Sequence, residues 1–280
     1  MISKILKIAL VGRTNAGKST LINRIVGEKI SIQNKKINTT QVTIIGVKNI
    51  IKTQLIFYDT PGSNFLKSLN KQSKNLKTNL WSGIDESDII FYLIDSKTAN
   101  IKFLFEQIEK LQEVKKKIIV IFNKIDLISN KQLLPLISNL NKNFQIDSFF
   151  TISAIQNIGI DDLLDYIKKY SYVSKWIFED DEITNKDDIF IVGELLRETM
   201  LTYLHKEIPY NVSIQTSNFK ILKNNDIKIK QKIIINQKRY KKIILGRKGE
   251  MIKKIREDSQ KKMSQILNAK IHLYLEILNA

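Results

Sequence analysis

The chain has 280 residues, with 46 Lys or Arg against 28 Asp or Glu, and a formal net charge of +18. This length favours two domains, and a hydrophobic content of 43% is enough to build folded cores, so the composition excludes wholesale disorder. Because the chain has no cysteine, a disulfide framework, a thiolate metal site and a cysteine nucleophile are excluded, and we expect a reducing, cytoplasmic location.

Short strands and helices alternate in the first part of the chain. Apolar runs rich in branched and aromatic residues predict buried strands at 5–11, 55–58, 89–94, 118–122 and 149–152. Between several of these strands, apolar residues recur at helical spacing, as over 101–111 and 163–167. This alternation predicts an α/β fold in which helices cover a mostly parallel sheet.

A phosphate-binding pattern, GxxxxGK[ST], follows the first predicted strand and precedes a predicted helix. It consists of Gly12, Arg13, Thr14, Asn15, Ala16, Gly17, Lys18 and Ser19, with Thr20 directly after it. The glycines let the backbone curl, so that its N–H groups and the start of the helix face phosphate oxygens. Lys18 can supply a positive charge to the β and γ phosphates, and the hydroxyl of Ser19 can bind Mg²⁺.

Two further loops are expected to act on the same phosphates. The strand at 55–58 is followed by the DxxG pattern and one more residue, namely Asp59, Thr60, Pro61, Gly62 and Ser63. Asp59 can hold Mg²⁺ through a water, and the N–H of Gly62 can meet the γ phosphate. Thr39 and Thr40 lie in an earlier polar loop, where one threonine would close on Mg²⁺ when the γ phosphate is present, and we favour Thr40.

The residues that select the base follow the last two of these strands. Asn123, Lys124, Ile125 and Asp126 form the pattern NKxD, and Ser153 and Ala154 follow the fifth strand. The carboxylate of Asp126 can accept the ring N–H and the amino group of guanine, which adenine does not offer at those positions. Leaving that buried carboxylate unpaired would cost about a hundredfold in selectivity. We expect Asn123 to tie this loop to the phosphate loop, and a backbone N–H at 153–154 to meet the guanine O6.

The acidic stretch at 171–189 interrupts this alternation, and we place the domain boundary there. We expect a nucleotide-binding domain over 1–172, an acidic linker over 173–190 and a smaller α+β domain over 191–280. The last domain begins with a predicted amphipathic helix and an extended segment after Pro209. Further on, the sequence predicts strands at 227–236, 241–245 and 270–278.

Basic residues are concentrated in the second domain. Between Lys220 and Lys262 there are 16 basic and 4 acidic residues, a net charge of +12. This charge predicts a polyanionic partner, nucleic acid first and an anionic membrane surface second, with a solvated lysine-rich surface as the alternative. Within the segment lies a GxxG pattern before a basic helix, and the candidate RNA-binding residues are Gly246, Arg247, Lys248, Gly249, Lys253 and Lys254. A GxxG loop lets the backbone of single-stranded RNA approach closely, and a plain turn at a helix start is the alternative.

These motifs together resemble the Era family of bacterial GTPases over nearly the whole chain. The resemblance rests on the loops above, on EIPYNVSI from Glu207 and on ILGRKGEMIKKI from Ile244. It implies a P-loop GTPase domain followed by a type II K homology (KH) domain, with GTP or GDP and Mg²⁺ as ligands. It also implies assembly of the 30S subunit through the 3′ end of small-subunit ribosomal RNA, and peripheral contact with the inner membrane. We expect a monomer.

The chain departs from the family pattern at Gln41, where arginine is usual, at Thr14, where proline is usual, and at Ser63, where a hydrophobic residue is common. Ser63 cannot position a water as the glutamine of Ras-type GTPases does, so we expect slow intrinsic hydrolysis. Asn15 resembles the asparagine that helps to bind K⁺ in some relatives, and a loop-bracing amide is the alternative. The candidate catalytic residues are therefore Lys18, Thr40 and Asn15.

Two other functions compete with a GTP-hydrolysing switch. One is an RNA-binding assembly platform that holds GTP structurally and barely turns it over. The other is a regulatory GTPase of the membrane surface, which would bind liposomes more strongly with anionic lipid and low salt.

Overall fold

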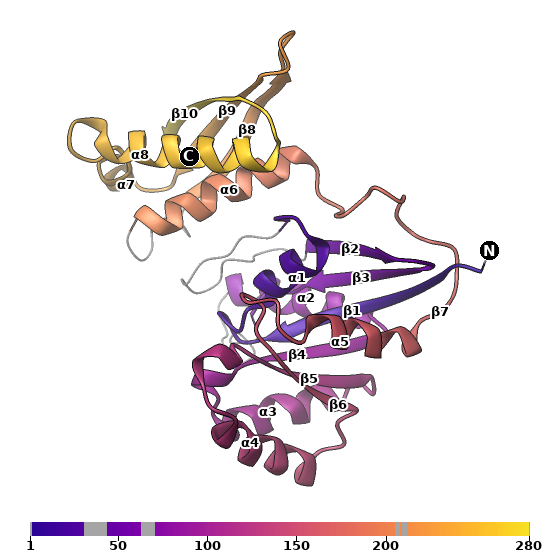
Figure 1. The fold of residues 1–280 in the computed structure, drawn as a ribbon. Coiled ribbons are helices and arrows are strands. Elements are labelled where there is room, and N and C mark those ends of the chain that lie inside the picture. Colours follow the sequence, from indigo (N-terminus) through magenta and orange to yellow (C-terminus); the bar gives the residue numbers. More distant parts are fainter. Residues whose placement is uncertain (1, 31–43, 63–70, 205–207, 209–211, 280) are drawn as a thin grey trace. The chain divides into compact units, whose positions relative to one another are not determined.

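The computed structural model describes residues 2–30, 44–62, 71–204, 208 and 212–279 (Figure 1). Thr39, Thr40, Gln41 and Ser63 lie outside the described residues. The described chain forms two compact units that divide between Asn185 and Lys186. None of the described helices combines the length and the apolar composition that crossing a bilayer requires.

The first unit is built on a sheet of seven strands, in the order β2-β3-β1-β4-β5-β6 with β7 beside β1. The strands are β1 (Lys4–Gly12), β2 (Ile44–Ile50), β3 (Thr53–Asp59), β4 (Ile89–Asp95), β5 (Lys117–Asn123), β6 (Ser148–Ile152) and β7 (Tyr172–Val173). Only β2 and β7 run antiparallel to their neighbours. The predicted α/β fold with a mostly parallel sheet is confirmed, while β2 and β7 were not predicted from the sequence.

Helices cover this sheet because its strands are apolar on both faces. They are α1 (Lys18–Val26), α2 (Lys71–Asp85), α3 (Ile101–Gln112), α4 (Asn130–Asn143) and α5 (Ile160–Ile167). On one face, Tyr92 of β4 and Phe122 of β5 are fully buried against side chains of α2, α3 and α4. Helix α1 packs against β1, β2 and β3. Parallel strands that are buried on both faces are typical of this architecture.

The acidic segment that we expected as a linker joins the first unit as far as Asn185. Its backbone pairs with the free edge of β2, where the N–H of Val47 donates to the carbonyl of Ile183 at 2.8 Å. Gln54 of β3 is fully buried and bonds to the same segment: its Oε1 accepts from the N–H of Ile177 at 2.9 Å and its Nε2 donates to the Phe178 carbonyl at 2.9 Å. This strap, residues 173–185, covers an edge strand that would otherwise expose its hydrogen-bonding groups.

The second unit packs three helices on one face of a small sheet. Its elements are α6 (Asp188–Tyr203), β8 (Val212–Ile221), β9 (Ile227–Ile235), α7 (Lys238–Leu245), α8 (Glu250–Ile266) and β10 (Ile271–Asn279). The strand order is β10-β9-β8, with β9 parallel to β10 and antiparallel to β8. Alternate residues of β9 enter a core shared with the three helices. The predicted smaller domain with a mixed α+β fold is confirmed.

One prediction in this unit is wrong. Residues 241–245, expected as a short strand, belong to helix α7. Tyr240 and Ile244, four residues apart, are both buried in the core, whereas Ile243 between them is exposed. That is the spacing of one helix face, and the exposed lysines around it supply the polar face.

Candidate nucleotide site and RNA-binding loop

The phosphate loop is shaped by β1, which ends at Gly12, and by α1, which begins at Lys18. Gly17 precedes the helix with φ of +100°, a left-handed conformation that favours glycine. A Cβ atom at Gly17 would lie 2.1 Å from Nδ2 of Asn123, so no larger residue fits there. The start of α1 therefore faces the loop with its unbonded N–H groups, as an anion site requires.

Lys18 lies buried inside this loop. Its Nζ donates to the carbonyls of Gly12 at 3.0 Å and Arg13 at 3.2 Å. Burial lowers the pKa of Lys18 to about 8, and the nearby carboxylate of Asp59 partly opposes that shift. A phosphate group that entered the loop would find a concentrated positive charge with its amine already oriented.

The two candidate Mg²⁺ ligands of the described chain are in contact. Ser19 donates from Oγ to Oδ2 of Asp59 at 2.8 Å, and Asp59 is fully buried at the end of β3. A hydroxyl and a carboxylate are hard oxygen donors that fit Mg²⁺, which also keeps several waters and phosphate oxygens as ligands. Gly62 lies against the phosphate loop, because a Cβ there would be 2.8 Å from the nitrogen of Thr14. The third candidate ligand, Thr40, lies outside the described residues.

Asn123 joins the base loop to the phosphate loop. Its Nδ2 donates to the carbonyl of Ala16 at 2.9 Å. Its Oδ1 accepts from the N–H groups of Lys124 at 2.8 Å and Ala154 at 3.0 Å. One buried amide thus connects three loops, and its loss would leave several buried polar groups without partners.

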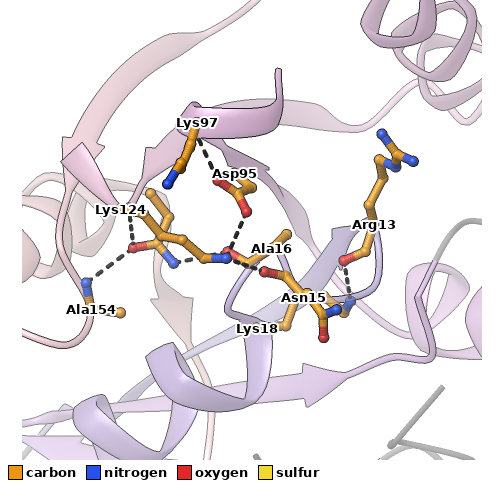
Figure 2. A network of polar contacts seen from close by, with 9 residues as sticks. Arg13, Asn15, Ala16, Lys18, Asp95, Lys97, Lys124 and Ala154 are labelled. Carbon is orange, nitrogen blue, oxygen red and sulfur yellow. Dashed lines mark hydrogen bonds and ion pairs between the residues drawn. The ribbon is translucent and has the colours of Figure 1, made fainter. Parts of the chain in front are cut away.

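Lys124 makes a second connection to the phosphate loop. Its Nζ donates to the carbonyl of Asn15 and to Oδ2 of Asp95, both at 2.6 Å, as Figure 2 shows. Asp95, at the end of β4, also accepts from the N–H of Lys97 at 3.0 Å. Asp95 was not predicted as a site residue, although a carboxylate at the end of a parallel strand is a recognisable signal.

Arg24 of α1 is the other residue of the site that was not predicted from the sequence. Its guanidinium donates to the carbonyls of Ala154 at 3.3 Å and Ile155 at 2.8 Å. The first helix therefore holds the loop after β6 in place. Its only sequence signal is a basic residue in the last turn of a helix, which is too common to indicate a site.

One of our expectations about base recognition needs correction. Asp126 is exposed and not buried as expected, and its Oδ1 accepts from Oγ of Ser153 at 2.6 Å. Selectivity for guanine requires the carboxylate to be shielded from water, so the bound base itself has to provide that shielding. The N–H groups of Ser153 and Ala154 donate within the protein, to the carbonyl of Ile158 and to Oδ1 of Asn123. A bond from Ala154 to a guanine carbonyl would have to share or replace its bond to Asn123.

The GxxG loop of the second unit lies between α7 and α8, and not after a strand. Gly246 has φ of +72°, and a Cβ there would be 2.5 Å from Cβ of Met251. Arg247 and Lys248 are exposed, so two charged side chains project from the loop. Lys253 and Lys254 are exposed on the first turns of α8. The loop thus offers a close backbone approach beside four positive charges.

One mostly parallel sheet brings a phosphate loop, a DxxG loop and an NKxD loop to the same edge, which is the architecture of the P-loop GTPases. Residues 7–124 match the family described as 50S ribosome-binding GTPase, and residues 207–279 match the KH domain. The class is therefore a P-loop GTPase with a C-terminal KH domain.

Comparison with whole proteins is more specific. The chain is 35% identical over 274 residues to GTPase Era of Rickettsia bellii, covering 98% of this chain and 92% of that protein. GTPase Era of Agrobacterium fabrum is also 35% identical, with 96% and 84% covered. A solved structure of Era in complex with MgGDPNP and nucleotides 1506–1542 of 16S ribosomal RNA superimposes with a TM-score of 0.91 at 30% identity, over 99% of this chain and 94% of that one. The chain belongs to the Era family of GTPases.

Proposed function

We propose that this Era-family protein is a GTP-hydrolysing switch that binds the 3′ end of small-subunit ribosomal RNA and assists assembly of the 30S subunit. The observation that carries the proposal is the joining of the base loop to the phosphate loop through Asn123, in a chain that also holds an exposed GxxG loop. The first feature fits a guanine nucleotide, and the second fits single-stranded RNA.

The reaction is the transfer of a phosphoryl group from GTP to water. Water bonds to the γ phosphorus, the bond to the β–γ bridging oxygen breaks, and GDP leaves with that electron pair while the water's proton goes to phosphate. Lys18 holds the β and γ phosphates, and the N–H groups at the start of α1 orient them. Ser19 and Asp59, together with Thr40 from outside the described residues, would hold Mg²⁺, which would supply positive charge to those phosphate oxygens.

Base selection falls to Asp126. Its carboxylate accepts the ring N–H and amino group of guanine, while Ser153 Oγ, 2.6 Å away, holds the carboxylate in orientation. Asn123 and Lys124 keep this loop in register with the phosphate loop. Cleavage is slow without a further group, because Ser63 cannot orient the attacking water.

Asn15 is the residue that would help to bind K⁺ as an activating charge. The alternative is a loop-bracing role, which is favoured by its φ of +67°, a conformation that asparagine tolerates better than most residues. Single-turnover hydrolysis in potassium and in sodium buffer separates the two. A higher rate in potassium that Asn15→Ala abolishes supports K⁺ activation, and equal rates exclude it.

The KH unit is the RNA-binding half of the switch. Era in the RNA complex noted above binds the 3′ region of 16S ribosomal RNA, and the present chain matches that protein over both of its units. We place the protein in the cytoplasm as a monomer, with peripheral contact to the inner membrane. A platform that holds GTP without turnover remains the second candidate.

The test is RNA binding with a GTP analogue and with GDP. The probe is an RNA that copies the host's small-subunit ribosomal RNA 3′ end, and we expect tight, sequence-dependent binding that the GTP analogue favours. The variant Arg247→Asp with Lys248→Asp should abolish that binding. Its control, Lys131→Asp with Lys142→Asp, makes the same change in charge on the exposed surface of α4. Binding that ignores both sequence and nucleotide would contradict the proposal.

A further inference from the structure

The sheet of the KH unit has one covered face and one open face. The helices cover the face on which Ile229 and Ile233 of β9 are fully buried. Successive side chains of a strand point to opposite faces. Lys228, Lys230 and Lys232 therefore share the open face, where Lys230 is exposed and the other two are partly exposed.

Strand pairing arranges this open face in three rows. The register places Lys220 and His272 beside Lys228, Asn218 and Tyr274 beside Lys230, and Gln215 and Glu276 beside Lys232. We call these nine side chains the sheet-face array. Neighbouring strands lie about 4.8 Å apart and four residues span about 13 Å of a strand, so the array is a compact patch.

The array has a strong excess of positive charge. It holds four lysines and the single carboxylate of Glu276. Asp226, next to it, is already bound by His272 at 2.7 Å and by Lys270 at 3.9 Å. No ion pair joins Lys228, Lys230 or Lys232 to a carboxylate within the described ranges. This charge is therefore left for an anionic partner.

An aromatic ring lies among these charges. Tyr274 lies in the middle row of the sheet-face array, beside Lys230, and its side chain is 52% exposed. The Nζ of Lys228 lies 5.4 Å from the centre of its ring, within cation–π range. Lysines beside an exposed aromatic ring on a sheet are the combination that binds single-stranded nucleic acid, since phosphates meet the charges and a base stacks on the ring.

We propose that the sheet-face array is a second RNA-binding surface, which holds the RNA segment adjoining the nucleotides at the GxxG loop. The inference rests on the proposed function, because it names a further part of the same RNA. A GxxG loop clamps about four nucleotides, so a longer RNA has chain to spare. The loop belongs to the helical layer and the array to the opposite face, so the RNA has to pass over an edge of the sheet. A single strand can make that bend.

The experiment compares two RNAs and three proteins. One RNA covers the span corresponding to nucleotides 1506–1542, which was used with the related Era, and the other is a short single strand from its 3′ end. The array variant carries Lys228→Gln, Lys230→Gln and Lys232→Gln. The control variant carries Lys102→Gln, Lys131→Gln and Lys142→Gln on exposed positions of α3 and α4. Thermal unfolding verifies that all three proteins are folded.

We expect the array variant to bind the longer RNA about tenfold more weakly, with a salt dependence whose slope falls by about two. Its affinity for the short RNA and the affinities of the control variant should stay at the original values. Photo-crosslinking from the longer RNA to Tyr274, absent in Tyr274→Ser, gives a second measurement that does not depend on charge.

Four results would overturn the inference. The first is an unchanged affinity of the array variant for the longer RNA, and the second is an equal loss of its affinity for both RNAs. The third is an equal loss of RNA affinity in the control variant. The fourth is an array variant that no longer binds phosphatidylglycerol vesicles but binds RNA as before. Failure of the unmodified protein to bind the short RNA would instead contradict the proposed function, and the longer RNA would still test the array.

Discussion

The side-chain amide of Asn123 donates to the backbone carbonyl of Ala16 across 2.9 Å, although the two residues are 107 positions apart. This bond joins the carboxyl end of β5 to the phosphate loop after β1. It makes the recognition of the base and the binding of the phosphates mechanically dependent on one another. A displacement of one loop should therefore displace the other.

Asn123→Ala should weaken the binding of GDP by about 1–3 kcal/mol, because it removes both the bond to Ala16 and the acceptor of Ala154 from a buried site. Titration with a fluorescent GDP analogue measures this. Asn139→Ala is the matched control, since Asn139 is exposed and bonds only within α4, to the carbonyl of Pro135. Equal effects of the two substitutions would contradict the role given to Asn123.

Asp126→Asn should change the base preference of the site from guanine to xanthine. The amide oxygen still accepts the ring N–H, but the amide nitrogen now faces the amino group of guanine with a second donor, whereas xanthine offers a carbonyl there. We expect the affinity for GDP to fall about a hundredfold and that for xanthosine diphosphate to rise. Competition binding measures both, with the exposed Asp162→Asn as control. Retained preference for guanine would remove Asp126 from base recognition.

Lys18 makes nucleotide binding depend on pH. Its pKa in the free protein is lowered to about 8 by burial, and bound phosphates would raise it again. Above that pH the free amine has lost the proton that the complex requires. Affinity should therefore be constant at low pH and fall by up to about tenfold per pH unit above about 8.

Titration of GDP binding between about pH 7 and about pH 9 tests this, together with proton uptake measured by calorimetry in two buffers. Guanosine, which has no phosphates, is the control for titration of the base itself. An affinity for GDP that follows the guanosine profile would show that Lys18 does not titrate in this range.

Gln54→Ala should release the strap. The substitution leaves the N–H groups of Ile177 and Phe178 without their acceptor at a partly buried position, at a cost of about 1 kcal/mol. Amide hydrogen exchange in residues 177–183 should become at least about tenfold faster. Gln112→Ala, which removes an exposed bond to the carbonyl of Gln145, is the control. Unaltered exchange would mean that pairing with β2 alone holds the strap.

Local patterns in the sequence predict the buried strands and the phosphate loop, because each depends on residues close together in the chain. The strand at 118–122 and the NKxD pattern after it are an example, since together they locate Asn123. Residues 241–245 were assigned to a strand because so short a run of apolar and basic residues fits both the two-residue period of a strand and the 3.6-residue period of a helix. The burial of Tyr240 together with Ile244 shows that the segment is helical.

The supporting contacts could not be predicted in the same way. Asp95, Arg24 and Gln54 act on groups from 29 to 131 positions away, through bonds that exist only once the sheet has formed. Arg24 and Gln54 are of common residue types that no short pattern distinguishes, and of the three only Asp95 carries a signal, as a carboxylate at the end of a strand. The bonds that Ser153 and Ala154 make within the protein have the same origin, because the turn to Ile158 and the approach of Asn123 are tertiary features.

The most direct test of the central claim is single-turnover hydrolysis of GTP, with protein in excess, in the absence and presence of the ribosomal RNA 3′ end. The switch account predicts slow release of phosphate without RNA, complete turnover given time, and a rate that responds to RNA. The same measurement on Lys18→Ala should give no phosphate. No turnover under either condition, with GTP tightly bound throughout, would contradict the account and favour the assembly platform.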